Sequence, residues 1–220
     1  MYRIIIGGVA LAGTLATAAY KHFSSSDKKK PTSLGRFAVW GRPNSGKTTF
    51  IERLRGRPIS DLKRETTTTR TIYKGIPLMI RGNSFQIDEI VDMPGNDDRR
   101  NDWIKLVGTH EHIFYLINIA RKTDRNYMTE VRKDLLDTVE ALRKIPNSEK
   151  RLNIIASHVD ECVFIKSDPA EIINVLQADD EFRRLYELMG EFAGYVYTVN
   201  FMDTTSFDSL LKSIVSDSHA

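Results

Sequence analysis

The segment Gly41 to Thr48 (GRPNSGKT) constrains the fold more than any other part of this 220-residue chain. It has the pattern G-x-x-x-x-G-K-T, with a short apolar run before it (Arg36 to Trp40) and helical spacing after it (Thr49 to Leu54). Glycines let backbone N–H groups turn toward phosphate oxygens, and the first turn of the following helix adds positive potential. We therefore predict a strand, a phosphate-binding loop and a helix in succession.

Two side chains of this loop have predicted roles. Lys47 is expected to contact the β- and γ-phosphates of a nucleotide, and the Thr48 hydroxyl is expected to bind Mg²⁺. The alternative is a glycine turn that carries a lysine by chance. The predicted nucleotide contacts are the loop and the residue after it: Gly41, Arg42, Pro43, Asn44, Ser45, Gly46, Lys47, Thr48 and Thr49.

A second motif, Asp92-Met93-Pro94-Gly95, follows a predicted strand over Ser84 to Val91 and stands 45 residues after Lys47. A carboxylate at the end of a strand can hold Mg²⁺ through water, so we predict that Asp92 serves the metal. The Gly95 N–H is expected to meet the γ-phosphate.

The threonine-rich segment Glu65 to Arg70 (ETTTTR) lies between these two motifs. A threonine hydroxyl from a loop here can complete the coordination of Mg²⁺ while the γ-phosphate is present. The alternative is the start of a strand, because threonine favours strands.

A third cluster of polar residues follows the buried strand predicted over Leu152 to Ala156. Ser157, His158 and Asp160 stand at its end as predicted nucleotide contacts. A carboxylate at this place can accept hydrogen bonds from N1–H and the N2 amine of guanine. Adenine has no such pair of donors, so Asp160 is predicted to select GTP. The alternative is an ordinary helix cap or loop aspartate.

The remaining pattern alternates strands with helices. We predict strands over His112 to Ala120 and Gly194 to Asn200, and helices over Val131 to Lys144, Glu171 to Leu176, Glu181 to Met189 and Phe207 to Val215. This order predicts an α/β fold of three layers with a mainly parallel sheet and right-handed crossovers. Ligands of such sheets bind at the carboxyl ends of the strands, where all three motifs fall.

The positive charge of the chain is concentrated at its start. Residues 1–36 hold six basic groups and one acidic group, whereas the other 184 residues hold 26 basic and 28 acidic groups. The net charge of +3 therefore divides into about +5 and −2. We expect no direct nucleic-acid binding. A single cysteine, Cys162, excludes an internal disulfide and a cysteine-based zinc site.

Seventeen consecutive residues of this basic leader (residues 1–36), Ile4 to Tyr20, are uncharged. A helix of this length rises roughly 25 Å, near the lower limit for crossing a bilayer. We predict a transmembrane anchor over residues 1–23, a flexible basic linker over 24–35 and a nucleotide-binding domain over 36–220. Lysines at 21 and 28–30 predict that the domain faces the cytoplasm on a single-pass anchor. The alternatives are a cleaved signal peptide, a buried amphipathic helix and a mitochondrial presequence.

The motifs GRPNSGKT, TTR and DMPG resemble those of P-loop GTPases of the translation-factor-related class, in the Era and TrmE-like branch. The resemblance covers roughly Arg36 to Asp217. It implies a GTPase domain that converts GTP to GDP and phosphate, with Thr69 as a further Mg²⁺ ligand and Asn44 as a K⁺ ligand. Lys47, Thr69 and Gly95 would then act in catalysis. The layout of an anchor plus one such domain is similar to that of the signal-recognition-particle receptor beta subunit.

The chain departs from this branch in the motif for the base. The family has Asn/Thr-Lys-x-Asp where this chain has Ser157-His158-Val159-Asp160, so His158 would stack on the base in place of lysine. Val199-Asn200-Phe201 stands where the last base-contacting loop is expected. The backbone N–H of Asn200 is the predicted contact to guanine O6.

A second departure concerns the attacking water. Asn96 stands where Ras-like enzymes carry glutamine, and asparagine is too short to reach the water, which implies slow intrinsic turnover. Arg99 and Arg100 either reach the phosphates or begin a helix as solvated residues.

Three functions fit these observations. The first is a membrane-anchored GTPase that hydrolyses GTP slowly and acts as a switch for a protein effector or activating protein. The second is a GTP-binding membrane adaptor with negligible hydrolysis. The third is a P-loop ATPase or kinase.

Overall fold

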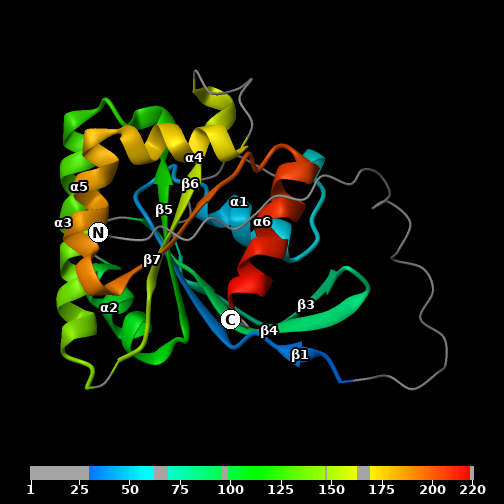
Figure 1. The fold of residues 1–220 in the computed structure, drawn as a ribbon. Helices are drawn as coiled ribbons and strands as arrows, with labels where there is room; N and C mark the ends of the chain where they lie inside the picture. The colour runs from blue at the N-terminus through cyan, green and yellow to red at the C-terminus, as the bar shows by residue number, and fades with distance from the viewer. Residues whose placement is uncertain (1–29, 62–68, 96–98, 147, 163–168, 219–220) are drawn as a thin grey trace.

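The structure is a computed structural model that describes residues 30–61, 69–95, 99–146, 148–162 and 169–218 (Figure 1). Its strands form one sheet in which β1 and β2 follow each other along one side of β4 in the same register, and β3 pairs along the other side of β4. Strands β5, β6 and β7 continue the sheet from β2 in that order. All pairs are parallel except β3 with β4. The strands are β1 (Thr32–Ser33), β2 (Arg36–Trp40), β3 (Thr71–Ile80), β4 (Asn83–Asp92), β5 (His112–Asn118), β6 (Leu152–Ser157) and β7 (Ala193–Thr198).

The described residues contain six α-helices. They are α1 (Lys47–Leu54), α2 (Arg100–Thr109), α3 (Arg125–Arg143), α4 (Pro169–Ala178), α5 (Asp180–Met189) and α6 (Thr204–Asp217). Short 3₁₀ turns are η1 (Ile59–Asp61), η3 (Ile119–Arg121), η4 (Val159–Glu161) and η5 (Gly190–Phe192). Asp124, Asp179 and Asp203 cap the N-termini of α3, α5 and α6 by accepting backbone N–H bonds, which fixes where these helices begin.

The helices cover both faces of the sheet and give three layers. Helices α2, α3 and α5 pack on one face, and α1 and α6 pack on the other (Figure 1). Central strands β5 and β6 are therefore buried along nearly their whole lengths, as expected for parallel strands covered on both sides. Strand β3 lies at an edge and alternates instead: Ile76, Leu78 and Ile80 are buried while Met79 is exposed.

Most of the predicted elements are present in the described residues. The strand at Arg36 to Trp40 is confirmed, as are the α/β architecture, the mainly parallel sheet and the predicted helices, several of which extend further than expected. Strand β3 was not predicted. Its run Thr71–Ile80 carries a lysine, a glycine and a proline, because it lies antiparallel at the edge, where such residues are tolerated.

The leader lies mostly outside the described residues, and so does the predicted transmembrane helix. Among residues 30–218 as far as they are described, no helix is long and apolar enough to span a membrane. The end of the predicted linker departs from expectation. Thr32 and Ser33 pair with β4, Leu34 is buried, and the Ser33 hydroxyl donates to Asp88 Oδ2 at 2.6 Å. These contacts make residues 32–35 part of the folded domain.

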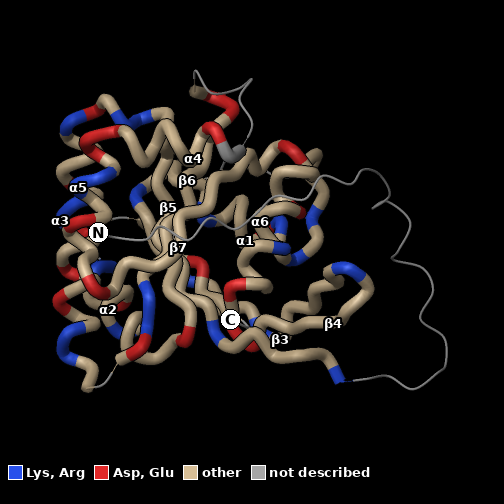
Figure 2. The backbone as a smooth tube through the Cα atoms, in the orientation of Figure 1, with Lys and Arg blue, Asp and Glu red and all other residues tan. Residues whose placement is uncertain are grey.

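Charges of both signs are mixed over the outer helices. Lys and Arg alternate with Asp and Glu along α3 and α5 (Figure 2), and cross-helix pairs such as Arg132 Nη1 with Glu181 Oε2 at 2.6 Å bind the two together. This layer thus presents a mixed surface.

Candidate functional site

The loop between β2 and α1 has the backbone that the glycine pattern requires. Gly41 and Gly46 have φ of 149° and 87°, and Asn44 has φ of 63°. A Cβ on Gly41 would stand 2.5 Å from the Leu116 carbonyl oxygen and 2.6 Å from Ser45 Oγ. The loop therefore lies directly on β5, too close for any side chain at position 41.

Lys47 begins α1 and points back into the loop. Its Nζ donates to the Arg42 carbonyl oxygen at 2.9 Å and lies 3.5 Å from Ser45 Oγ. Burial lowers the pKa of this ammonium to about 8, although the nearby carboxylates of Asp92 and Asp134 oppose that shift. A buried cation that bonds to oxygens of the loop can exchange them for phosphate oxygens.

Gly95 brings the second motif against the first. A Cβ on Gly95 would stand 2.5 Å from the Gly41 carbonyl oxygen and 2.7 Å from Lys47 Nζ. The backbone of residue 95 therefore touches the loop and its lysine, as the two predicted phosphate contacts require.

Thr48, in the first turn of α1, lies next to Asp92, the last residue of β4. The Thr48 hydroxyl donates to Asp92 Oδ1 at 3.4 Å, and Asp92 is buried at the end of β4. Desolvation raises the pKa of Asp92, in opposition to Lys47 and the Thr48 hydrogen bond, which lower it. A hydroxyl and a carboxylate oxygen, close together and partly desolvated, are a donor set that fits Mg²⁺.

Thr69 lies at the same end of the sheet and is exposed. It stands two residues before Thr71, which pairs with Asp92. Its role as a ligand of Mg²⁺ stays a prediction. Thr66 to Thr68 and Asn96 lie outside the described residues.

Ser157 connects the end of β6 to the phosphate-binding loop. Its buried Oγ lies 2.9 Å from the Ser45 carbonyl oxygen and 3.1 Å from that of Ile117, so its single proton serves one of these acceptors at a time. The His158 Nδ1 lies 2.9 Å from the same Oγ. Ser157 thus contacts the phosphate-binding loop from the end of β6, where the contacts to the base are predicted.

His158 and Phe201 stand beside Gly46. A Cβ on Gly46 would lie 2.8 Å from the Phe201 ring and 3.6 Å from His158 Cε1. His158 itself has a left-handed backbone with φ of 60°. The loops after β6 and β7 therefore both reach the glycine that precedes Lys47.

The other two predicted base contacts are less constrained. Asp160 lies in η4 and is partly exposed. The Asn200 N–H donates to Ser206 Oγ at 2.9 Å, and its Oδ1 accepts from the Met202 N–H at 2.8 Å. The N–H predicted to meet guanine is therefore engaged within the chain here, and its contact to the base stays a prediction.

Asn118, at the end of β5, is a site residue that the sequence analysis missed. Its Nδ2 donates to the Asn44 carbonyl oxygen at 3.2 Å, and its Oδ1 accepts from the Ala120 N–H at 3.0 Å. A buried asparagine at the carboxyl end of a central strand was the available signal.

The arginines near the loop point toward α3. Arg42 Nε lies 2.9 Å from Asp134 Oδ2, and Arg100 Nη2 donates to Asp134 Oδ1 at 3.1 Å. Arg99 Nη1 lies 3.5 Å from Asp102 Oδ2. The Arg42 side chain thus leaves the loop, and Arg100 is a partly buried helix residue with partners on α3.

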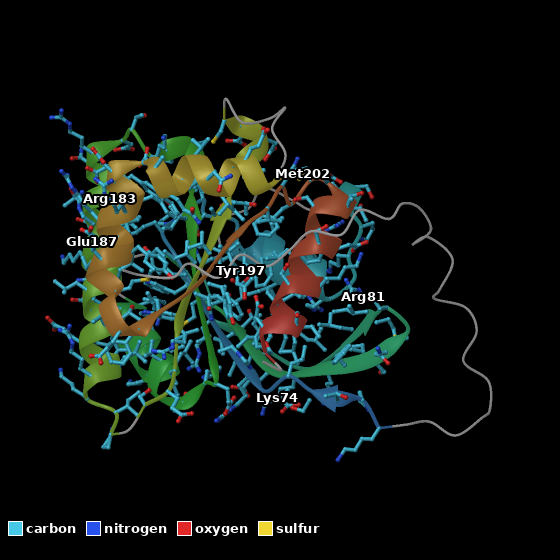
Figure 3. All side chains as sticks on the ribbon, viewed as in Figure 1. Lys74, Arg81, Arg183, Glu187, Tyr197 and Met202 are labelled. Carbon is cyan, nitrogen blue, oxygen red and sulfur yellow. The ribbon has the colours of Figure 1, made fainter. Side chains whose placement is uncertain are left out.

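A separate cavity of about 280 Å³ opens between α4, α5 and β7, lined by Leu176, Phe182 and Val196. Arg183 and Glu187 stand at it on α5 (Figure 3). None of the predicted site residues lines it. On the far side of β7, Tyr197 lies beside α6, where its hydroxyl donates to Asp217 Oδ2 at 2.9 Å (Figure 3).

Comparison with known proteins agrees with this geometry. A curated relative, the GTPase Era of Afipia carboxidovorans, is 35% identical over 69 residues, which are 31% of this chain and 21% of the relative. The match thus spans about a fifth of that protein's length.

A solved structure has the same fold: the Arl6 BBS3 small GTPase from Trypanosoma brucei with the bound nucleotide analogue GppNp. It is 17% identical, has a TM-score of 0.58, and the alignment covers 86% of this chain and 98% of that one. Residues 36–158, more than half of the chain, match the 50S ribosome-binding GTPase family. The chain is therefore a P-loop GTPase of the 50S ribosome-binding, Era-like family.

Proposed function

We propose that this protein is a membrane-anchored switch that binds GTP with Mg²⁺, hydrolyses it slowly and reports its state to a protein partner. The observation that carries the proposal is the convergence of Lys47, Thr48, Asp92 and Gly95 at the carboxyl ends of β2 and β4, with Thr48 Oγ1 3.4 Å from Asp92 Oδ1. Family membership supports GTP as the nucleotide.

The chain's own groups would act by alignment and charge. Lys47 would exchange the Arg42 carbonyl for the β- and γ-phosphates, and the Gly95 N–H would bind the γ-phosphate as negative charge shifts during transfer. Thr48 and Asp92 would hold Mg²⁺, with Thr69 completing the set. When bound, the metal would neutralise phosphate charge.

Slow turnover follows from the surroundings of the phosphates. Arg42 and Arg100 both form ion pairs with Asp134, so both guanidinium groups are directed to α3. A protein partner, or K⁺ bound at Asn44, would then supply further positive charge at the phosphates. Single-turnover release of phosphate, measured with K⁺ or Na⁺ as the matched monovalent ion, tests the contribution of potassium.

A GTP-binding adaptor without hydrolysis is the second candidate. It is favoured by Ser157 and His158, which bond to each other at 2.9 Å in place of the family's asparagine and lysine. Phosphate release that disappears in Lys47→Ala supports the enzyme, whereas GTP binding without release supports the adaptor. Equal competition by ATP against a fluorescent GTP analogue would support an ATPase or kinase instead.

The membrane anchor is proposed from residues 4–20, and the lysines that follow them favour a domain on the cytoplasmic side. Because β1 begins at Thr32, deletion of residues 1–30 leaves the described domain whole. We expect the full chain to sediment with membranes and the truncated chain to stay in the supernatant. A truncated chain that still sediments contradicts the anchor.

We propose a protein surface as the partner's contact. The family is named for binding the 50S ribosome, which offers both protein and RNA, but residues after position 36 carry a net charge of about −2. Binding to 50S subunits that falls steeply with salt would point to RNA contacts instead.

A further inference from the structure

Helix α3 carries a buried carboxylate, Asp134, between the phosphate-binding loop and the start of α2. It is 2% exposed. Three groups converge on it: the Tyr115 hydroxyl donates to Oδ2 at 2.7 Å, Arg42 Nε lies 2.9 Å from Oδ2, and Arg100 Nη2 donates to Oδ1 at 3.1 Å. One carboxylate thus contacts the loop, the central strand β5 and the first residue of α2.

Each arginine also has a second carboxylate on the same helix. Arg42 pairs with Glu130, and Arg100 Nε lies 2.8 Å from Asp137 Oδ2. Positions 130, 134 and 137 are spaced by four and three, so they share one face of α3. Asp134 is the member that both arginines share.

Packing alone does not account for a charge in this position. Burying an ion pair costs desolvation that apolar residues of similar size avoid, so such a network is weak evidence for a purely stabilising role. The layers are also joined without it: Trp103 of α2 donates to Thr138 Oγ1 at 2.8 Å and stacks on Trp40 at 5.6 Å. Asp134 adds a specific connection between α2 and the residue after Gly41.

We propose that Asp134 is a positioning residue that couples α2 to the phosphate-binding loop. Its carboxylate holds Arg42, and with it the loop that cradles the phosphates, while it also holds Arg100 and the start of α2. If α2 shifts and Arg100 moves away, Asp134 pairs with Arg42 alone. The strength of the Arg42–Asp134 ion pair then changes, and with it the affinity of the loop for the nucleotide. This inference rests on the proposed function, since the coupling is read out through GTP and GDP.

The test compares dissociation rates of fluorescent GTP and GDP analogues from the full chain. Arg100→Gln is expected to change the ratio of the two rates about tenfold, a typical size for coupling between sites. When Arg100→Gln is added to a protein that already carries Asp134→Asn, the ratio should change less than about twofold, because the carboxylate shared by the two arginines is absent. Arg132→Gln is the control, since it removes an ion pair of α3 that faces α5 and contacts neither α2 nor the phosphate-binding loop.

Thermal unfolding separates coupling from support of the fold. Arg100→Gln should lower the melting temperature more than Arg132→Gln, because Asp134 is buried and Glu181 is partly exposed, and only Arg100→Gln should move the ratio. If Asp134→Asn does not fold, Arg42→Gln replaces it in the double-mutant comparison. The inference is overturned if Arg100→Gln moves melting but leaves the ratio unchanged, or if the two substitutions act additively. A wild-type chain that binds neither analogue contradicts the proposed function itself.

Discussion

Two regions of the site differ in whether backbone or side chains determine their geometry. The phosphate end consists of the loop Gly41 to Thr48 with Asp92 and Gly95, and the base end consists of Ser157, His158, Asp160 and Asn200. At the phosphate end, three glycines stand where a Cβ would lie within 2.8 Å of a neighbour: Gly41, Gly46 and Gly95. At the base end, side chains carry the geometry, and those of Ser157 and Asn200 already bond to other residues of the chain.

This difference explains why the phosphate-binding motifs match the family sequence pattern while the base-binding motif, Ser157 to Asp160, departs from it. Backbone approach allows only glycine at positions 41, 46 and 95, so the phosphate motifs leave little freedom of sequence. A side-chain contact can be made by other groups of similar reach: Ser157 supports the loop where the family has asparagine or threonine. Perturbing each end separately is therefore the best test of the comparison.

The largest effect is expected at the close approach of the two phosphate motifs. Gly95→Ala places a methyl group 2.5 Å from the Gly41 carbonyl oxygen and 2.7 Å from Lys47 Nζ. We expect GTP affinity to fall about 100-fold or more, because the backbone must move away from the phosphates. Titration with a fluorescent GTP analogue measures the loss.

Gly108→Ala is the control for that substitution. Gly108 lies in α2 with open space around its Cβ position, so alanine should stabilise the protein by about 0.5–1 kcal/mol and leave GTP affinity unchanged. Equal GTP affinities of Gly95→Ala and Gly108→Ala would contradict the conclusion that close backbone contact determines the geometry of the phosphate end.

The base end is tested next by Asp160→Asn. Loss of a charged acceptor for guanine should weaken GTP about 30-fold, and the amide should improve binding of xanthosine triphosphate. Competition between the two nucleotides measures the change in preference. The neighbouring Glu161→Gln should leave it unaltered, and an unchanged preference in Asp160→Asn would refute the assignment of Asp160.

The pH dependence of the phosphate end provides a third test. Burial lowers the pKa of Lys47 to about 8, so the nucleotide-free protein loses this positive charge as the pH rises through that value. Loss of this charge should lower affinity about tenfold between pH 7 and pH 9. Inorganic triphosphate used as the competing ligand removes the base from the measurement, and a flat profile would contradict the role of the buried ammonium.

The lowered pKa of Lys47 affects the stability of the fold in the opposite direction from the affinity. Between about pH 8 and the ordinary pKa of 10.5, the unfolded chain holds the lysine proton and the folded chain does not. This contribution to stability of the nucleotide-free protein therefore rises with pH across that window.

The smallest effect is expected from Ser157→Ala, which removes the contact between β6 and the loop. Losing one hydrogen bond from Oγ to the Ser45 or Ile117 carbonyl oxygen should weaken GTP about fivefold. Ser218→Ala, which removes a hydroxyl bond to the Ile214 carbonyl within α6, should leave affinity unchanged. A loss in Ser157→Ala as large as that in Gly95→Ala would erase the difference between the two ends.

The limits of sequence-based prediction follow the same division. Lys47, Thr48, Asp92 and Gly95 were predictable because strand–loop–helix geometry fixes both their types and their places. Strand β3 was not, because an antiparallel edge strand with a lysine, a glycine and a proline has no continuous apolar pattern.

Long-range polar contacts were harder to predict. Asp134 lies on the same helix as Leu135 and Val139, and no local pattern links it to Arg42, 92 positions earlier. Asn118 reaches Asn44 from the next strand of the sheet. Both contacts depend on the order of the strands, which the alternation of helices and strands leaves open.

Single-turnover hydrolysis of GTP with Mg²⁺ tests the central claim most directly, using the full chain and its Lys47→Ala variant. The account predicts slow phosphate release by the wild-type protein and a loss of at least about 100-fold in the variant. Equal release by both proteins, or no GTP binding by the wild type, would contradict it.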